Sequence, residues 1–166
     1  MLNNFEKALA LVLKSEGGFV NNPADPGGMT NLGVTKKAWE SYVGHGVSQA
    51  VMESLMPAGV APFYRTRYWN NAQCDYMPTG VDYMLFDFAV NAGVSRAIKT
   101  LQSAVGAVPD GSIGAATMSA IEVCPDLPDR FADEKRNFYQ SLPTFPTFGR
   151  GWLNRVNEVL ANAKTF

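Results

Sequence analysis

Near the N-terminus, the residue best suited to chemistry is Glu16. It falls on the same helical stripe as Phe5, Leu9 and Val12, because residues placed about 100° apart bring these positions within about 60° of one another. A carboxyl group that faces apolar side chains favours its neutral form, and a neutral carboxylic acid can serve as a general acid near neutral pH. The alternative is an exposed carboxylate at the end of the helix, where Gly17 begins.

A second carboxylate, Asp25, follows nine positions later in a stretch rich in glycine, proline and asparagine. Glycines allow tight turns and close backbone approach, so this loop can fold back and set Asp25 across a gap from Glu16. Two carboxylates in unlike surroundings, one buried and one solvated, are what cleavage of a glycosidic bond requires. The alternative for Asp25 is an ordinary turn residue before Pro26.

The elements that must position these residues are mostly helices. Hydrophobic spacing and breaker residues predict helices over 3–16, 35–42, 48–55, 58–69, 79–92, 95–105, 114–123, 127–141 and 150–163. Residues 17–33 are predicted as a loop, with a short hairpin inside 18–34, and residues 143–149 as a loop rich in proline and phenylalanine. The helix at 79–92 is apolar nearly all round, which is typical of a central, buried helix. The prediction is a mainly α, compact fold.

Composition and charge exclude several classes of protein. The 166 residues are 46% hydrophobic and 17% charged, enough to bury a core as one domain or one domain with a small appendage. A formal net charge of -1 argues against a nucleic-acid binder, and no apolar run is long enough for membrane insertion. Cys74 and Cys124 have no zinc-site spacing and His45 stands alone, so we expect no metal and no cofactor. A single bridge between the two cysteines stays open.

The loop carries a family resemblance. Residues 16–35 (EGGFVNNPADPGGMTNLGVT) resemble the signature of glycoside hydrolase family 108, the N-acetylmuramidase type of peptidoglycan hydrolase that includes phage endolysins and secretion activator proteins. Further similar segments follow in order: FYRTRYW at 63–69, FDFAVNAG at 86–93, Ala97 with Leu101 and Gln102, DGSIG at 110–114 with Thr117, and GRGW at 149–152 with Arg155. The resemblance covers nearly the whole chain. It implies a lysozyme-like fold, with a muramidase catalytic part at 1–70 and a helical peptidoglycan-binding part at 71–166, packed as one compact unit.

The resemblance also implies roles for individual residues. The family's acid falls on Glu16 and its second carboxylate on Asp25, while Thr30 matches the threonine of related Glu–Asp–Thr phage muramidases. The implied reaction cleaves the β-1,4 bond between N-acetylmuramic acid and N-acetylglucosamine. Glu16 would protonate the glycosidic oxygen, Asp25 would orient a water or steady the oxocarbenium ion, and Thr30 would hold that water. Retention and inversion both stay open.

Three further residues are predicted to bind substrate: Asn31, Tyr64 and Asn91. Asn91 shares one helical face with Asp87; we favour a substrate contact for Asn91 and a hydrogen-bonded structural role for Asp87. Tyr64 could stack on a sugar, although an aromatic residue at helical spacing is more often part of a core.

Two other functions stay open at this point. A lytic transglycosylase would need only Glu16, because the sugar's own 6-hydroxyl attacks. A non-catalytic wall-binding or secretion-assisting protein would bind the wall through its C-terminal half. The N-terminus shows no signal-peptide pattern, so we expect synthesis in the bacterial cytoplasm and action in the periplasm or cell wall, reached through a holin lesion or an export machinery. We expect a monomer whose partner is the glycan strand of peptidoglycan.

Overall fold

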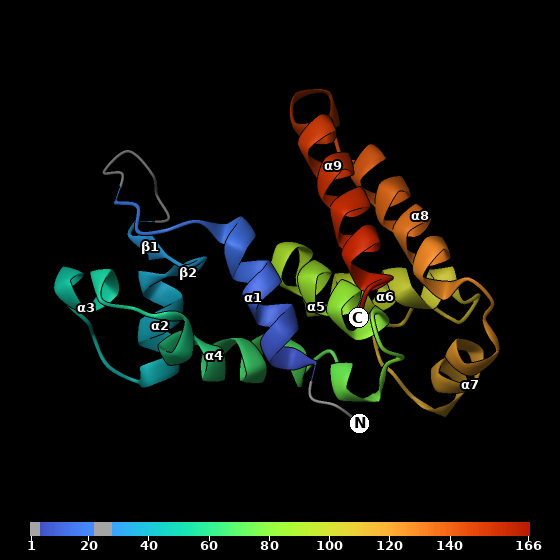
Figure 1. Ribbon diagram of the computed structural model, residues 1–166, viewed down its shortest axis with the longest axis horizontal. Coiled ribbons are helices and arrows are strands. Elements are labelled where there is room, and N and C mark those ends of the chain that lie inside the picture. The colour runs from blue at the N-terminus through green and yellow to red at the C-terminus, as the bar shows by residue number, and fades with distance from the viewer. Residues whose placement is uncertain (1–3, 22–27) are drawn as a thin grey trace. The chain divides into compact units, whose positions relative to one another are not determined.

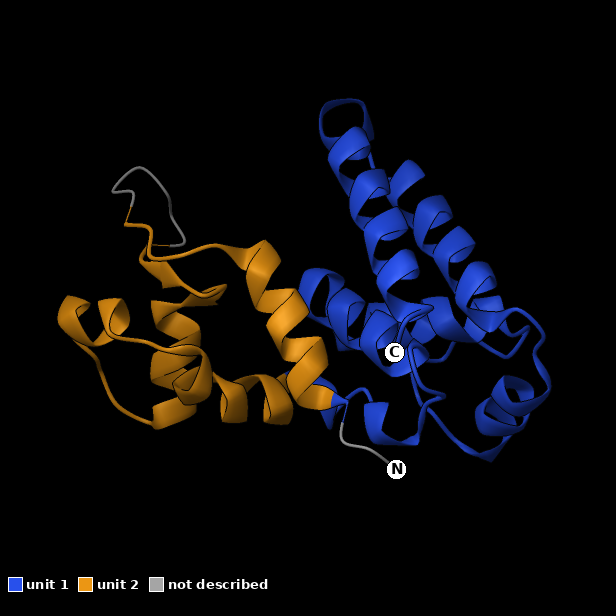
Figure 2. Ribbon diagram, viewed as in Figure 1, with its two compact units in different colours: residues 1–4, 68–166 blue, residues 5–67 orange. Residues whose placement is uncertain are grey.

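The computed structural model describes residues 4–21 and 28–166 and is mainly α-helical (Figure 1). The mainly α prediction is therefore confirmed. The chain divides into two compact units, a small unit, Phe5–Arg67, and a large unit, Met1–Asn4 with Tyr68–Phe166 (Figure 2). Within the described residues, no helix combines the length and apolar character that crossing a bilayer requires.

The small unit is a set of helices with one hairpin. Its elements are α1 (Phe5–Glu16), β1 (Thr30–Asn31), β2 (Val34–Thr35), α2 (Lys36–Val43), α3 (Gln49–Glu53) and α4 (Pro57–Tyr64). The buried face of α1 includes Leu9 and Val12, and α4 packs beside this helix. Thr35 caps α2, since its hydroxyl accepts a hydrogen bond from the Ala38 amide at 3.1 Å. The two-stranded hairpin confirms the one expected inside 18–34.

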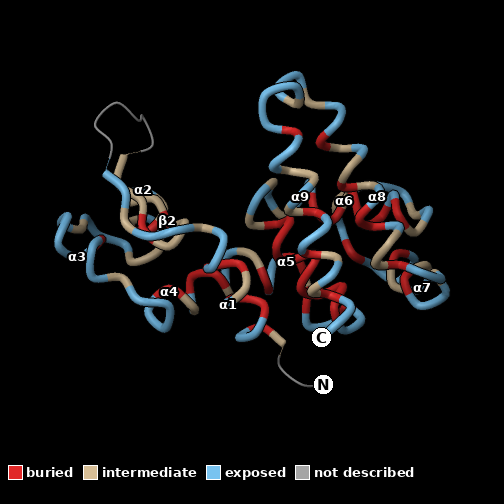
Figure 3. The backbone as a smooth tube through the Cα atoms, turned by 45° about the horizontal axis from the view of Figure 1, so that its top comes forward, coloured by how far each residue is buried: buried red, intermediate tan, exposed pale blue. Residues whose placement is uncertain are grey.

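The large unit is built around one buried helix. Its elements are a 3-10 turn (Cys74–Tyr76), α5 (Val81–Ala92), α6 (Val94–Ala104), α7 (Ala115–Val123), α8 (Leu127–Gln140) and α9 (Phe145–Ala163). Every residue of α5 from Val81 to Ala89 is buried (Figure 3). α6 and α9 pack against α5, and α8 packs against both α6 and α9. The predicted central helix is thus confirmed.

Two predicted boundaries are wrong. The loop expected at 143–149 is largely helical, because α9 begins at Phe145. Pro146 lies in the first turn, where backbone N–H groups have no acceptor within the helix, so the missing N–H of proline costs no hydrogen bond. Its fixed φ also suits a helix. The helix expected over 58–69 ends as an α-helix at Tyr64 and continues as a π-helical turn, Arg65–Trp69.

Both cysteines are free, so the bridge left open by the sequence does not form.

Candidate active site

Glu16 is the last residue of α1 and is half-buried. It continues the stripe of Phe5, Leu9 and Val12, all of which are buried. Gly17 follows with a φ of 78°, a left-handed conformation that ends the helix and turns the chain away. The side chain is therefore partly shielded by the small unit rather than extended into bulk solvent.

A hairpin turn packs directly against Glu16. Leu32 and Gly33 connect β1 to β2 with φ values of 51° and 74°, the pattern of a two-residue turn with both central residues left-handed. A Cβ on residue 33 would lie 2.9 Å from Glu16 Cγ and 2.6 Å from Tyr64 Oη. Only glycine leaves room for this approach, so the turn backbone lies against the aliphatic part of the Glu16 side chain.

Tyr64 holds the turn in place. Its side chain is 1% exposed, and its hydroxyl donates a hydrogen bond of 2.7 Å to the Leu32 carbonyl. Tyr64 thus positions the backbone beside Glu16, and its burial removes the ring face that sugar stacking would need. This is the core position that aromatic residues at helical spacing usually have, and the substrate contact of Tyr64 stays a prediction.

Asn31 holds the hairpin from its other side. The side chain is buried, and its amide donates hydrogen bonds to the carbonyls of Met52, at 2.8 Å, and Glu53, at 3.4 Å. These bonds tie β1 to the end of α3. The side-chain amide predicted to bind substrate is therefore engaged within the protein.

Thr30 lies where the loop after Glu16 returns to the hairpin. Its amide donates to the Val20 carbonyl at 2.9 Å, and its carbonyl accepts from the Val20 amide at 2.8 Å. Successive side chains of a strand alternate, so Thr30 lies on the face opposite buried Asn31, and it is half-buried. Asp25 falls outside the described residues, between these two bridged positions.

Asp87 and Asn91 belong to the large unit. Asp87 is buried, and its carboxylate accepts hydrogen bonds from Lys135 Nζ at 3.2 Å and from Arg155 Nη2 at 2.8 Å. The structural role favoured for Asp87 is confirmed. Asn91 is exposed and donates its side-chain amide to the Asp87 carbonyl at 2.7 Å, so its substrate contact stays a prediction.

Burial, together with the charge of Asp87, shifts the pKa values of three nearby side chains. Burial lowers the pKa of Lys135, and the Asp87 carboxylate opposes that shift. Burial and the negative charge of Asp87 raise the pKa of both Tyr83 and Tyr139 to about 12. Sequence reasoning missed Lys135, although it follows Phe131 and precedes Tyr139 at helical spacing on the buried stripe of α8. The position of Lys135 on that apolar stripe could have predicted its burial from the sequence.

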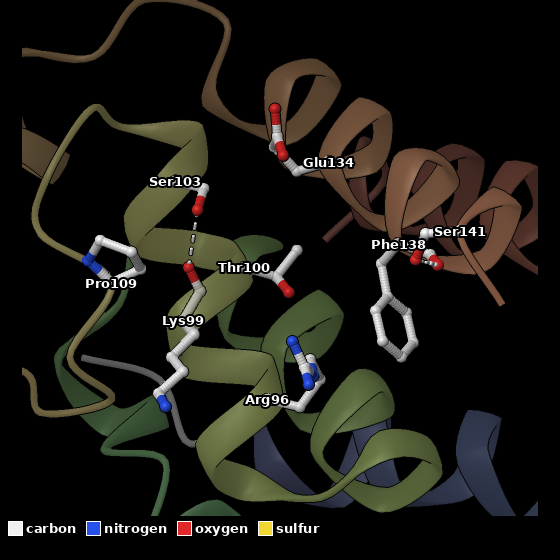
Figure 4. Close-up of a pocket in the computed structure, with 8 residues that line it drawn as sticks. All are labelled: Arg96, Lys99, Thr100, Ser103, Pro109, Glu134, Phe138 and Ser141. Carbon is white, nitrogen blue, oxygen red and sulfur yellow. Dashed lines mark hydrogen bonds between the residues drawn. The ribbon is translucent and has the colours of Figure 1, made fainter.

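Among residues 4–21 and 28–166, no group of three or more His, Cys, Asp and Glu side chains could hold a metal ion. A hollow of about 330 Å³ opens between α6 and α8 of the large unit (Figure 4).

The mainly α fold, with a half-buried glutamate at a helix end beside a tight hairpin, fits a lysozyme-like glycoside hydrolase. Residues 9–93 match the family described as Glycosyl hydrolase 108, and the chain belongs to this family. It is a peptidoglycan hydrolase of the N-acetylmuramidase type. The family match ends before α6, so peptidoglycan binding by residues 71–166 stays a prediction.

The structure is also similar to a solved one, "Structure of Brucella abortus SagA", with 38% sequence identity and a TM-score of 0.86. The similarity covers 100% of this chain and 97% of that chain. Among curated proteins, none matches the chain.

Proposed function

We propose that Glu16 is the general acid that cleaves the bond between N-acetylmuramic acid and N-acetylglucosamine. The observation that carries the proposal is the packing of the Leu32–Gly33 turn against the Glu16 side chain. This turn lies against the Cβ and Cγ atoms of Glu16 and shields part of the half-buried side chain from solvent. A protonated carboxyl in such a setting can transfer its proton to a glycosidic oxygen with little reorganisation.

The reaction follows from that transfer. The proton moves from Glu16 to the glycosidic oxygen, the bond to the anomeric carbon breaks, and the N-acetylglucosamine portion leaves with its new hydroxyl. Positive charge then develops at the anomeric carbon of the muramic acid, and a water adds there. The water's proton leaves to a base, so that hydroxide and proton together account for one water consumed.

Asp25 and Thr30 are proposed as the partners that serve the water. Asp25 would stabilise the developing charge or act as the base, and the Thr30 hydroxyl would hold the water. Support comes from the Val20–Thr30 bridge, because Asp25 lies five residues from each bridged position and the covalent chain limits its distance from the hairpin.

The products of digested peptidoglycan test the reaction. Mass spectrometry of purified sacculi treated with the protein should show reducing muramic acid ends that carry one added water. Ends lighter by one water, the 1,6-anhydro form, would replace the hydrolase with a lytic transglycosylase. The configuration of the new anomeric centre would also separate retention, expected for carboxyl groups roughly 5–5.5 Å apart, from inversion, expected at roughly 6.5–9.5 Å.

Two variants test the partners of Glu16. Asp25→Asn should lower the rate of sacculus lysis by about 100-fold or more, and Thr30→Val by about 10-fold, because proton transfer and water positioning contribute on that scale. Asn21→Ser, an exposed change in the same loop, is the control and should keep its rate. An Asp25→Asn protein that lyses sacculi normally would remove Asp25 from the mechanism.

We also propose that the protein reaches the wall as a monomer, through a holin lesion or an export machinery. The position of peptidoglycan outside the cytoplasmic membrane supports an assisted route. Expression with and without a holin, followed by culture turbidity, tests that route, and sedimentation equilibrium of the purified protein tests the monomer.

A further inference from the structure

The hairpin turn of the small unit contains a residue that does not favour its own conformation. Leu32 and Gly33 form a two-residue turn in which both φ values are positive, a turn type that normally takes Asn-Gly or Asp-Gly. Glycine adopts this conformation without strain, whereas the Cβ of leucine disfavours it. The conformation of Leu32 therefore depends on interactions from outside the turn.

The strands on either side of this turn are anchored without it. Asn31 in β1 donates a hydrogen bond of 2.8 Å to the Met52 carbonyl. Thr30 exchanges two backbone hydrogen bonds with Val20, at 2.8 Å and 2.9 Å. A contact that reaches the turn alone can therefore change the turn while the base of the hairpin stays fixed.

The Tyr64 side chain makes such a contact. Its hydroxyl donates a hydrogen bond of 2.7 Å to the carbonyl of Leu32, the residue with the disfavoured conformation. The Tyr64 ring is 1% exposed and meets the Phe63 ring edge to face, with centroids 5.5 Å apart. Burial limits the access of a competing water, and the packed ring directs the hydroxyl at this carbonyl.

The backbone that carries Tyr64 is irregular. The α-helix α4 ends at Tyr64 and the chain continues as the π-helical turn Arg65–Trp69. Pro62 lies inside the same helix and lacks a backbone donor two residues before Tyr64. Turns of the π type are rare and are frequent at functional sites. The position of Tyr64 thus has a cost in regular helical structure, which a residue that only fills a core does not require.

The turn, the phenol and the candidate acid meet at one point. A Cβ built on Gly33 would lie 2.6 Å from Tyr64 Oη, 2.9 Å from Glu16 Cγ and 3.0 Å from Glu16 Cβ. A shift of the turn therefore changes the space around the aliphatic part of Glu16. The rate of a catalysed reaction falls steeply when a reacting group is displaced by about 1 Å.

We propose that Tyr64 is a positioning residue of the hydrolysis: its hydroxyl holds Leu32 in the left-handed conformation, and the turn fixed in this way holds Glu16 where it can protonate the glycosidic oxygen. Tyr64 acts through the turn and touches no reacting atom. The inference rests on the proposed role of Glu16. It assigns Tyr64 an effect on kcat, whereas a residue that only contacts the sugar would act on KM.

The variant Tyr64→Phe keeps the ring and removes the hydroxyl. With soluble, uncross-linked peptidoglycan strands as substrate, kcat should fall about ten-fold and KM should stay within about two-fold, because one buried hydrogen bond is lost and the sugar contacts are kept. Tyr42→Phe is the matched control and should keep the wild-type kcat. It removes a phenol hydroxyl from the same unit, on a ring that also packs edge to face against Phe63.

A second substitution tests whether the effect passes through the turn. Leu32→Asn creates the Asn-Gly pair that favours this turn without outside help. It should therefore raise the kcat of Tyr64→Phe by about five-fold or more, and should change the kcat of the wild type by less, which is the coupling expected of two residues that act on one conformation. A purely structural role of Tyr64 in the core would not be rescued by a change in the turn.

The turn can also be disturbed with Tyr64 intact, which keeps the test open if Tyr64→Phe does not fold. Valine is β-branched and resists a positive φ more strongly than an unbranched side chain does. Leu32→Val should therefore lower kcat more than Leu32→Met does, again with little change in KM. Thermal unfolding of each variant shows whether it is folded at the assay temperature.

Several results would overturn the inference. They are a wild-type kcat in folded Tyr64→Phe, a raised KM at unchanged kcat, which would support the sugar contact instead, no gain from Leu32→Asn in the Tyr64→Phe protein, and equal kcat in Leu32→Val and Leu32→Met. If Glu16→Gln keeps the wild-type kcat, the proposed function fails whatever Tyr64 does. If Glu16→Gln is inactive while Tyr64→Phe is normal, this inference alone fails.

Discussion

The two units place their polar groups in opposite ways. In the small unit, neutral hydrogen bonds from Tyr64 and Asn31 hold an irregular hairpin against Glu16. In the large unit, a buried carboxylate, Asp87, binds Lys135 and Arg155 at the centre of regular helices. The proposed chemistry therefore depends on backbone geometry in one unit, whereas buried charges in the other stabilise the packing of helices.

The irregular backbone of the small unit has a cost. Leu32 has a φ of 51°, and a left-handed conformation costs a residue with a Cβ about 1–2 kcal/mol. The Tyr64 hydrogen bond to the Leu32 carbonyl offsets part of this strain. Strain retained beside a candidate acid is typical of functional sites.

The largest expected effect is the loss of stability when the buried carboxylate of the large unit is removed. Asp87→Asn should lower the free energy of unfolding by about 3–5 kcal/mol, because Lys135 and Arg155 would lose the carboxylate that neutralises them. Urea unfolding followed by circular dichroism measures it. Asp129→Asn, which removes only a surface ion pair with Lys164, is the control and should change stability by about 1 kcal/mol or less. Similar losses in both variants would refute a special role for Asp87.

The next largest effect is expected in the small unit, where a substitution in the hairpin turn should lower the rate of sacculus lysis. Gly33→Ala introduces a Cβ that would lie 2.6 Å from Tyr64 Oη and 2.9 Å from Glu16 Cγ. The turn must shift, and a displacement of about 1 Å beside the acid should lower the rate of sacculus lysis by about 100-fold. Gly18→Ala, whose Cβ would meet nothing within 4 Å, is the matched control. Unchanged lysis by Gly33→Ala would separate the turn from catalysis.

The pH dependence of the free energy of unfolding tests the surroundings of Tyr139 in the large unit. The pKa of Tyr139 is raised to about 12 from its ordinary value of 10.0 by burial and by Asp87. The unfolded chain therefore loses this proton first, and the free energy of unfolding should fall as pH rises from 10 to 12. Tyr139→Phe should show a smaller fall over that range. Parallel curves for the two proteins would contradict the assigned burial of the phenol charge.

The smallest expected effect concerns Lys135. Replacement by methionine keeps an unbranched chain beside Phe88 and Phe131, while Arg155 still neutralises Asp87. The free energy of unfolding of Lys135→Met should therefore lie within about 1 kcal/mol of the wild-type value. The reason is that the cost of burying the ammonium is roughly equal to the stabilisation from its ion pair. A loss as large as that of Asp87→Asn would show that Lys135 is the principal partner.

The sequence predicts this molecule best where a pattern is local. The starts of α2 and α3, the buried run of α5 and the stripe that includes Glu16 all follow from residue spacing. The partners of Tyr64 and Asn31 could not be predicted, because each bond joins segments far apart in the chain. The start of α9 was missed because proline and phenylalanine suggest a loop, whereas Pro146 falls in a first helical turn.

Comparison of two glutamates on one helix tests the central claim most directly. Glu16 ends α1 beside the hairpin turn, and Glu6 lies exposed in its first turn. Sacculus lysis rates of Glu16→Gln and Glu6→Gln should be measured at equal concentrations of folded protein. The account predicts that Glu16→Gln loses about 100-fold or more, the scale of general acid catalysis, and that Glu6→Gln matches the wild type. Normal lysis by Glu16→Gln would contradict it.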